Sequence, residues 1–432
     1  HIMRNLLLIP AITFLLVQCK NIQAKHTPPA IDNRLHTLLD QKDFFRLAAR
    51  LNQWKDSIDD DERLYFQSFV DNAFNRNELS VARVDSLLQN YSSKFSDSAK
   101  AALQLLQGDS YFKLFNYLKA AEADSFVLRD YGKSLDSEKV SDIKNDLLIR
   151  NALQHTPPQF VSVTENTTIP WTRDAIGIIE IPVKYNTATY SCIFDTRANI
   201  SSITQTYAKK LGIKMLDVSY EEGSGITGIK FKTGLGIADS LYIGDILLRN
   251  VVFQVMPDSI LYLAPVHFSL NVIIGFPVIS QLREIHIFKN GSMVIPLHQT
   301  ASELHNFALD GLDPVISLLT GNDTLSFNLD LGASTSDFYY AFFEKNKSRI
   351  MKEGHLKTLQ YGGAGGLQKK QVYMVPDIEL YLGNKKVVLD SATVLMQKIF
   401  PTEKMYGNIG NDFTSQFNEL VLNFDYMYIE GN

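Results

Sequence analysis

Residues 192–204, from Cys192 to Thr204, read CIFDTRANISSIT. An apolar run ends in Asp195, and small and polar residues follow it, which is typical of a strand that enters a tight turn. Residues 327–339 read FNLDLGASTSDFY and repeat the arrangement around Asp330. In both stretches an Ala stands three positions after the Asp and a Ser stands six positions after it: Ala198 and Ser201, Ala333 and Ser336.

The two stretches begin longer segments that follow the same order. Each continues with a helix-like segment, a Gly-rich hairpin, a pair of strand-like segments and an apolar run that ends near a Gly. The interval from Asp195 to Gly275 is the same as the interval from Asp330 to Gly410. Unrelated segments would not share both the order and the interval. The sequence therefore predicts an internal duplication, with lobes at 159–300 and 301–432.

These segments resemble the retropepsin-like aspartic peptidases, and the resemblance covers residues from about 170 to 429. It implies a two-lobed acid-protease β domain in which Asp195 and Asp330 form the catalytic dyad. It also implies a monomer, because one chain supplies both lobes, and it implies no cofactor and no metal. The resemblance further assigns the dyad turns (Thr196, Arg197, Ala198, Leu331, Gly332, Ala333), the glycines beneath them (Gly275, Gly410) and the substrate-covering flaps (Gly223, Gly225, Gly228, Tyr361, Gly362, Gly363, Gly365).

The implied reaction is the hydrolysis of peptide bonds. Without a metal or a covalent intermediate, the attacking water must be activated between two carboxylates, one acting as general base and the other as general acid. In the family, glycine in each turn leaves room for the opposing turn, and Thr in each turn donates a hydrogen bond across the interface. The first hypothesis is therefore an aspartic endopeptidase that acts on a peptide or protein substrate.

Three residues depart from the family pattern. Arg197 replaces a glycine of the turn, Leu331 replaces a threonine, and Asn408 is polar where the pattern is apolar. Leu331 cannot donate the hydrogen bond between the lobes. A guanidinium close to both carboxylates would favour their ionised forms and remove the shared proton that the mechanism requires.

Two alternatives to a loss of function remain open. The side chain of Arg197 could point outward while its backbone N–H still serves Asp195, or the dyad could bind something other than an ordinary peptide. The second functional hypothesis is a catalytically impaired, protease-like protein that binds peptides or serves as a scaffold.

The N-terminus is expected to be a lipoprotein signal peptide, residues 1–19. Arg4 precedes an apolar run from Leu6 to Val17, which is too short to span a bilayer. The following LVQC resembles the bacterial lipobox and implies lipidation of Cys19. The protein would then be anchored to a bacterial membrane outside the cytoplasm, on the periplasmic side or at the cell surface. The alternatives are a plain secretory signal with an incidental Cys and a short buried helix.

Residues 26–155 are predicted to be helical. The tetrapeptide HTPP occurs at 26–29 and at 155–158, and apolar residues recur at helical spacing between the two copies. ARVDSLLQNY at 82–91 is echoed by EADSFVLRDY at 122–131. This loose period favours a tetratricopeptide-like module, with an irregular helical bundle as the alternative. In both cases we expect an interaction module that binds a protein partner.

Other functional classes find little support in the sequence. The net charge is −5 and no basic run is present, which argues against nucleic-acid binding. Residues 223–228 match GxGxxG, but a strand-like segment follows them, so they are interpreted as a flap and not as a dinucleotide site. The nine His residues are scattered, which argues against a zinc site. Cys192 is expected to be buried and unreactive.

Overall fold

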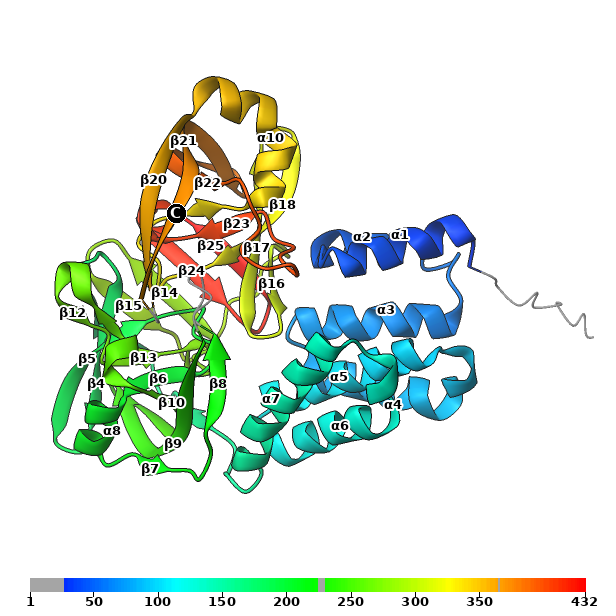
Figure 1. Cartoon of the computed structure of the whole chain (residues 1–432), viewed down its shortest axis with the longest axis horizontal. Helices are drawn as coiled ribbons and strands as arrows, with labels where there is room; N and C mark the ends of the chain where they lie inside the picture. Colours follow the sequence, from blue (N-terminus) through cyan, green and yellow to red (C-terminus); the bar gives the residue numbers. More distant parts are fainter. Residues whose placement is uncertain (1–26, 224–229, 364–365) are drawn as a thin grey trace, which may run out of the picture.

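The computed structural model describes residues 27–223, 230–363 and 366–432. An N-terminal helical region is followed by a larger β-rich part, as the sequence predicts (Figure 1). The expected signal segment with Cys19 and the expected flap residues Gly225, Gly228 and Gly365 lie outside the described residues. Among the helices that the structure describes, none is both long and apolar enough to cross a membrane.

The described part of the helical region folds into seven α-helices and two short 3₁₀ helices. They are α1 (Pro29–Asp40), α2 (Phe44–Gln53), α3 (Asp60–Ala73), α4 (Asn77–Asn90), η1 (Ser92–Lys94), α5 (Asp97–Lys113), α6 (Tyr117–Asp130), η2 (Gly132–Ser134) and α7 (Ser137–Leu153). The offset between the echoed stretches of the sequence recurs in these bounds. The elements α4, η1 and α5 begin at positions 77, 92 and 97, and α6, η2 and α7 begin at positions 117, 132 and 137.

The α2 helix illustrates how the sequence determines these elements. Phe44, Leu47 and Leu51 recur at helical spacing, and all three are buried. The Asp43 side chain accepts a hydrogen bond from the backbone N–H of Arg46, which caps the first turn.

Residues 160–300, here called the first β unit, contain a ten-stranded sheet among the described residues. Its strands are β1 (Phe160–Ser162), β3 (Thr172–Arg173), β4 (Ile179–Tyr185), β5 (Ala188–Phe194), β6 (Ser201–Thr204), β7 (Lys214–Met215), β8 (Tyr220–Gly223), β9 (Lys230–Ile243), β10 (Ile246–Met256) and β13 (Val272–Ile274). The remaining elements that belong to this unit alone are α8 (Gln205–Leu211), η3 (Asp258–Ile260), β11 (Tyr262–Leu263), η4 (Ala264–Val266), β12 (Phe268–Ser269) and α9 (Phe276–Gln281).

Residues 301–432, here called the second β unit, contain an eight-stranded sheet among the described residues. Its strands are β16 (Phe307–Asp310), β17 (Asp313–Thr320), β18 (Asp323–Leu329), β19 (Asp337–Phe338), β20 (His355–Gly363), β21 (Gly366–Leu382), β22 (Lys385–Leu395) and β23 (Gly407–Ile409). The helices of this unit are α10 (Tyr340–Glu353) and α11 (Asn411–Thr414).

Corresponding strands of the two units pair in the same way. In the first unit β13 runs parallel to β5 and antiparallel to β6. In the second unit β23 runs parallel to β18 and antiparallel to β19. In both units the pairing places a short strand that ends just before a glycine beside the strand that ends just before an Asp.

A third sheet joins the two units and lies between them (Figure 1). The first unit contributes β2 (Thr167–Pro170), β15 (Ser292–Ile295) and β14 (Glu284–Phe288), and the second contributes β24 (Glu419–Asn423) and β25 (Tyr428–Gly431). The link between the units is the antiparallel pairing of β14 with β24.

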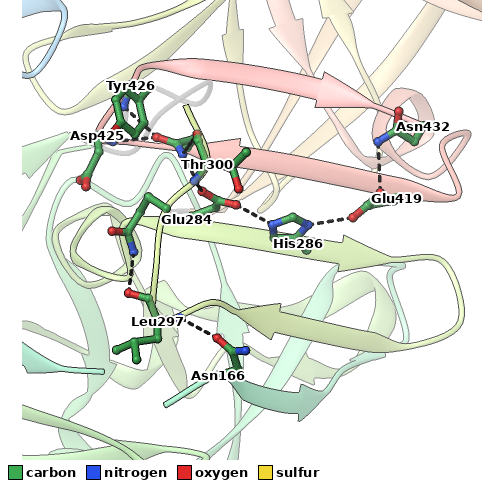
Figure 2. A network of polar contacts seen from close by, with 11 residues as sticks. Asn166, Glu284, His286, Leu297, Thr300, Glu419, Asp425, Tyr426 and Asn432 are labelled. Carbon is green, nitrogen blue, oxygen red and sulfur yellow. Dashed lines mark hydrogen bonds and ion pairs between the residues drawn. The ribbon is translucent and has the colours of Figure 1, made fainter. Parts of the chain in front are cut away.

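A polar network reinforces this link (Figure 2). The ring of His286 lies between two carboxylates, with Nε2 2.7 Å from Oε1 of Glu284 and Nδ1 2.7 Å from Oε1 of Glu419. Burial alone would lower the pKa of His286, but hydrogen bonds to the two carboxylates outweigh it and raise the pKa above its ordinary value. Glu284 is fully buried and also accepts a hydrogen bond from Nδ2 of Asn423 at 2.7 Å.

The helical region packs against both β units. Leu153 of α7 is fully buried in an apolar cluster with Tyr117 of α6 and with Tyr220 and Leu235 of the first unit. Apolar residues of the helices, among them Phe74, also belong to one buried cluster with residues of the second unit such as Phe307 and Phe424. An ion pair between Lys42 and Asp310 at 2.5 Å adds to this contact. The helices are therefore part of one packed molecule with the β-rich part.

Candidate active site

The two expected catalytic residues stand at the ends of corresponding strands. Asp195 follows β5, and its backbone N–H donates to the carbonyl of Ile274 at 3.0 Å. Asp330 follows β18, and its backbone N–H donates to the carbonyl of Ile409 at 2.9 Å. The carboxylate of Asp195 accepts a hydrogen bond from the backbone N–H of Arg197 at 2.7 Å. Each Asp is therefore held at the start of a turn by the strand that runs beside it.

The glycines expected beneath the turns lie directly under them. A Cβ at Gly275 would overlap the carbonyl oxygen of Ala198, and a Cβ at Gly410 would stand 2.6 Å from that of Thr335. Backbone atoms cannot yield as a flexible side chain can. No residue with a side chain fits at either position without displacing a turn.

Equivalent residues of the two units also hold these glycine segments to the turns. The Ser that stands six positions after each Asp accepts a hydrogen bond from the glycine N–H, at 3.0 Å between Gly275 and Ser201 and 2.9 Å between Gly410 and Ser336. The Ala of each turn accepts one from the residue after that glycine, at 2.8 Å from Phe276 to Ala198 and 2.9 Å from Asn411 to Ala333. The repeated Ala and Ser of the sequence thus have a structural role.

Thr196 connects the two turns. Its hydroxyl donates to the carbonyl of Leu329 at 2.8 Å and accepts from the backbone N–H of Leu331 at 3.0 Å. Leu331, which stands where the family has a second threonine, is fully buried and returns no such bond from its side chain. The hydroxyl bonds between the turns therefore come from the first turn.

Gly332 places the carboxyl group of Asp195 against the second turn. A Cβ at Gly332 would overlap Cγ and both carboxyl oxygens of Asp195. Burial, and after it the charge of Asp330, raises the pKa of Asp195 to about 7. The structure therefore brings the two predicted carboxyl groups together at the boundary between the units.

The side chain of Arg197 extends into the second unit. One terminal nitrogen donates to Oδ1 of Asn408 at 3.0 Å and to the hydroxyl of Tyr339 at 3.4 Å. Its Nε stands 3.5 Å from Oδ1 of Asp313. Burial would lower the pKa of Arg197, but Tyr339, Asp313 and Asp330 together raise it.

Arg197 acts on Asp195 in the expected direction, but other influences on this carboxyl group are stronger. Arg197 does act to lower the pKa of Asp195, but burial and the charge of Asp330 outweigh it, and the pKa is raised. The reason is the direction of the Arg197 side chain: its backbone N–H serves Asp195, while its guanidinium points away from Asp195. This agrees in part with the alternative that the side chain points outward. The side chain points into the second unit instead.

Asn408 connects Arg197 to the second carboxylate. Its Nδ2 donates to Oδ2 of Asp330 at 2.8 Å, while its Oδ1 accepts from Arg197. Two of the three departures from the family pattern are therefore in contact. The sequence offered no signal for Tyr339 and Asp313, which complete the surroundings of Arg197.

The predicted flap segments form two hairpins in the described residues. Gly223 ends β8 and pairs with Lys230 of β9. Tyr361, Gly362 and Gly363 end β20, where Gly363 pairs with Gly366 of β21. Both hairpins are therefore present up to their tips.

Two further expectations concern groups outside the dyad. Within the described ranges, no cluster of three or more His, Cys, Asp or Glu residues could hold a metal ion. Cys192 is buried, as expected, and burial raises the pKa of its thiol.

Comparison with known families gives a match in the first β unit. Residues 181–278 match the model of a family described as aspartyl protease. A search among curated proteins found no match to the chain. The matched segment contains Asp195, its turn and Gly275. It supports an aspartyl protease domain in this chain, and such a domain suggests peptidase activity.

Proposed function

We propose that the protein is an aspartic endopeptidase that hydrolyses peptide bonds with water held between Asp195 and Asp330. One observation carries the proposal: the carboxyl group of Asp195 fills the space over Gly332, on the turn that carries Asp330. A carboxyl group with a pKa of about 7 beside a second carboxylate supplies an acid and a base in one site.

The reaction needs no other group. One carboxylate takes a proton from water as the water oxygen attacks the peptide carbonyl carbon, and the other carboxyl gives its proton to the carbonyl oxygen. When this tetrahedral intermediate collapses, the carboxyl group that took the proton from water gives it to the peptide nitrogen, a hydroxyl of the intermediate returns its proton to the other carboxylate, and the C–N bond breaks. The products are a carboxylic acid and an amine, and the dyad regains its single proton.

The fold that we propose for residues 159–432 is the duplicated, two-lobed retropepsin-like domain. The equivalent strand pairings, the two buried glycines and the Ser–glycine hydrogen bonds support it. In this fold the hairpins β8–β9 and β20–β21 are flaps that cover the substrate and exclude water.

A second candidate function is a peptide-binding or scaffolding protein without catalysis. The observation that favours it is the pair of turn replacements. Leu331 provides no second hydroxyl bridge, and Arg197 brings a positive charge next to the dyad through Asn408. Such a protein would retain both hairpins and the paired carboxyl groups and would hold a peptide without cleaving it.

Localisation and partners are part of the proposal. The lipobox-like Cys19 supports a protein that is lipid-anchored to a bacterial membrane outside the cytoplasm, on the periplasmic side or at the cell surface. The constant offset between successive helix pairs supports a tetratricopeptide-like module that binds a protein partner. Both β units lie in one chain, which supports a monomeric enzyme without a cofactor.

Cleavage of an unfolded protein such as casein, measured from pH 3 to 9, tests the function. Asp195→Asn and Asp330→Asn are each expected to abolish cleavage, while Asp239→Asn, an exposed Asp in β9, leaves it unchanged. Cleavage that persists in both dyad variants would overturn the proposal. Absence of cleavage in the unaltered protein, together with cleavage by Arg197→Gly, would favour the binding protein.

A further inference from the structure

The two carboxyl groups of the dyad have different hydrogen-bond donors. Asp195 accepts from backbone N–H groups of its own turn, those of Arg197 and Ala198, whereas Asp330 accepts from the side-chain amide of Asn408. The residue that corresponds to Asn408 in the first unit is Ile273, which occupies the same place in the strand pairing. The side chain of Ile273 has no donor to offer. The second unit therefore carries a polar group next to the dyad that the first unit lacks.

Arg197 determines which end of the Asn408 amide faces Asp330. A guanidinium has donors and no acceptor, so the atom of Asn408 that faces it must be the oxygen. The amide nitrogen then points to Asp330, at 2.8 Å from Oδ2. A donor that is polarised by a positive charge favours the ionised form of the carboxyl group that accepts it, and Asn408 is bound to the Arg197 guanidinium. The orientation of a single amide therefore distinguishes the two carboxyl groups.

Arg197 is itself held in place. Asp313, the first residue of β17, lies 3.5 Å from Nε, and Tyr339, which precedes α10, places its hydroxyl 3.4 Å from a terminal nitrogen. Asn408 is only 7% exposed, so water competes weakly for its hydrogen bonds. The bonds from Arg197 through Asn408 to Asp330 are therefore made entirely by side chains of the protein itself.

We propose that Arg197 and Asn408 form a positioning pair that keeps the negative charge of the dyad on Asp330 and its proton on Asp195. The assignment rests on the proposed peptidase function for its catalytic meaning. Asp330 then acts as the general base toward water, and Asp195 is the general acid toward the peptide carbonyl. Arg197, which departs from the family pattern, thus keeps the proton on one carboxyl group in place of equal sharing between the two. The dyad itself is retained.

The pH dependence of cleavage follows from this assignment. Asp195 must carry its proton to act as an acid, so the rate should fall as the pH rises through about 7. The charged groups that act on Asp195 are Asp330 and Arg197, and the titratable groups Tyr339 and Asp313 act on Arg197. Arg197 stays positively charged throughout the range.

The test uses carbon-13 NMR of the full chain labelled at the Asp side-chain carboxyl carbon, with Asp195→Asn and Asp330→Asn to assign the two signals. In the unaltered protein the proton taken up near pH 7 should appear on Asp195 and not on Asp330. In Arg197→Met and in Asn408→Leu that proton should be shared between the two signals. Arg249→Met, an exposed arginine in β10, serves as the matched control. Equal uptake on both residues in the unaltered protein would overturn the proposal.

A double-variant cycle separates a positioning role from a merely structural one. Arg197→Met and Asn408→Leu should each lower kcat about tenfold to a hundredfold with little change in KM, because each removes an oriented hydrogen bond to charge. Since Arg197 acts through Asn408, the double variant should be no slower than the single variants. Effects that multiply would contradict the pair.

The carboxyl titration and a further variant, Asn408→Asp, test the pair even if cleavage or folding fails. If no form of the protein cleaves, the peptidase proposal fails, and the carboxyl titration still decides where the proton lies. If Arg197→Met does not fold, Asn408→Asp replaces the donor with an acceptor of the same size. It should move the proton to the Asp330 side, and a proton that stays on Asp195 would overturn the proposal.

Discussion

At the scale of single residues, the site depends on a position that has no side chain. The carboxyl group of Asp195 occupies the space that a Cβ of Gly332 would need. The contact joins two turns that are distant in the chain, and it sets how closely the carboxyl groups approach. A methyl group added at Gly332 would displace the Asp195 carboxyl group and so act directly on the proposed reaction.

We therefore expect Gly332→Ala to lower kcat about a hundredfold or more, because a displacement of about 1 Å at a reacting group has an effect of that size. Cleavage of casein measures it, and circular dichroism verifies the fold. Gly132→Ala is the matched control, since nothing lies within 4 Å of a Cβ there. Equal activity in the two variants would contradict the contact.

Thr196 carries the hydroxyl bonds between the turns. Thr196→Val keeps the shape and leaves the buried N–H of Leu331 without its acceptor. The free energy of unfolding should fall by about 1–3 kcal/mol, as measured by urea denaturation. Thr189→Val, at an exposed position in β5, is the control and should change stability by less than about 0.5 kcal/mol. A loss no larger than that of the control would show that the bridge is unimportant.

The sequence was informative about the dyad and uninformative about Arg197, for a physical reason. Asp195, Asp330 and the two glycines are set by short-range patterns and equal intervals, which a sequence displays. The direction of the Arg197 side chain depends on Asn408, Tyr339 and Asp313, which lie far from it in the chain. Such distant partners become neighbours only through the fold.

At the scale of elements, the pairing of β14 with β24 joins the two units, and His286 lies across it. The pKa of His286 is raised in the folded protein, so its charged form is favoured by folding. The resulting stability is fully present below the unfolded pKa of about 6.5 and is lost as the pH rises through the raised folded pKa.

His286→Gln should therefore lower the free energy of unfolding by about 1–3 kcal/mol near pH 6, with a smaller difference at pH 9. Urea denaturation at both values measures this difference. His298→Gln, at an exposed position, should show no such pH-dependent loss. A difference that grew toward pH 9 would mean that neutral His286, and not its charged form, supports the sheet.

At the scale of the whole molecule, the helices and the β-rich part share buried surface. The change from helix-like to strand-like sequence after the second HTPP predicted the order of the two parts. It could not predict that Leu153 would pack on Tyr220 and Leu235, because an apolar residue in a helix looks the same in sequence whichever element covers it. The base of the β8–β9 hairpin therefore rests on the helical region.

Leu153→Ala should lower the free energy of unfolding by about 2–5 kcal/mol, since it removes a fully buried side chain. It should also speed hydrogen exchange in β8 and β9 as well as in α7. Leu148→Ala is the matched control in the same helix, where the side chain is 49% exposed. Faster exchange confined to α7 would show that the helices and the first β unit are energetically independent.

If Asp195 and Asp330 form one electrostatically coupled pair, each carboxyl group responds to the charge of the other. The most direct measurement is the carboxyl titration of Asp195 by carbon-13 NMR in the unaltered protein and in Asp330→Asn. Since the charge of Asp330 contributes to raising the pKa of Asp195 to about 7, that pKa should fall when Asp330 becomes neutral. An Asp195 titration that is the same in both proteins would contradict the dyad.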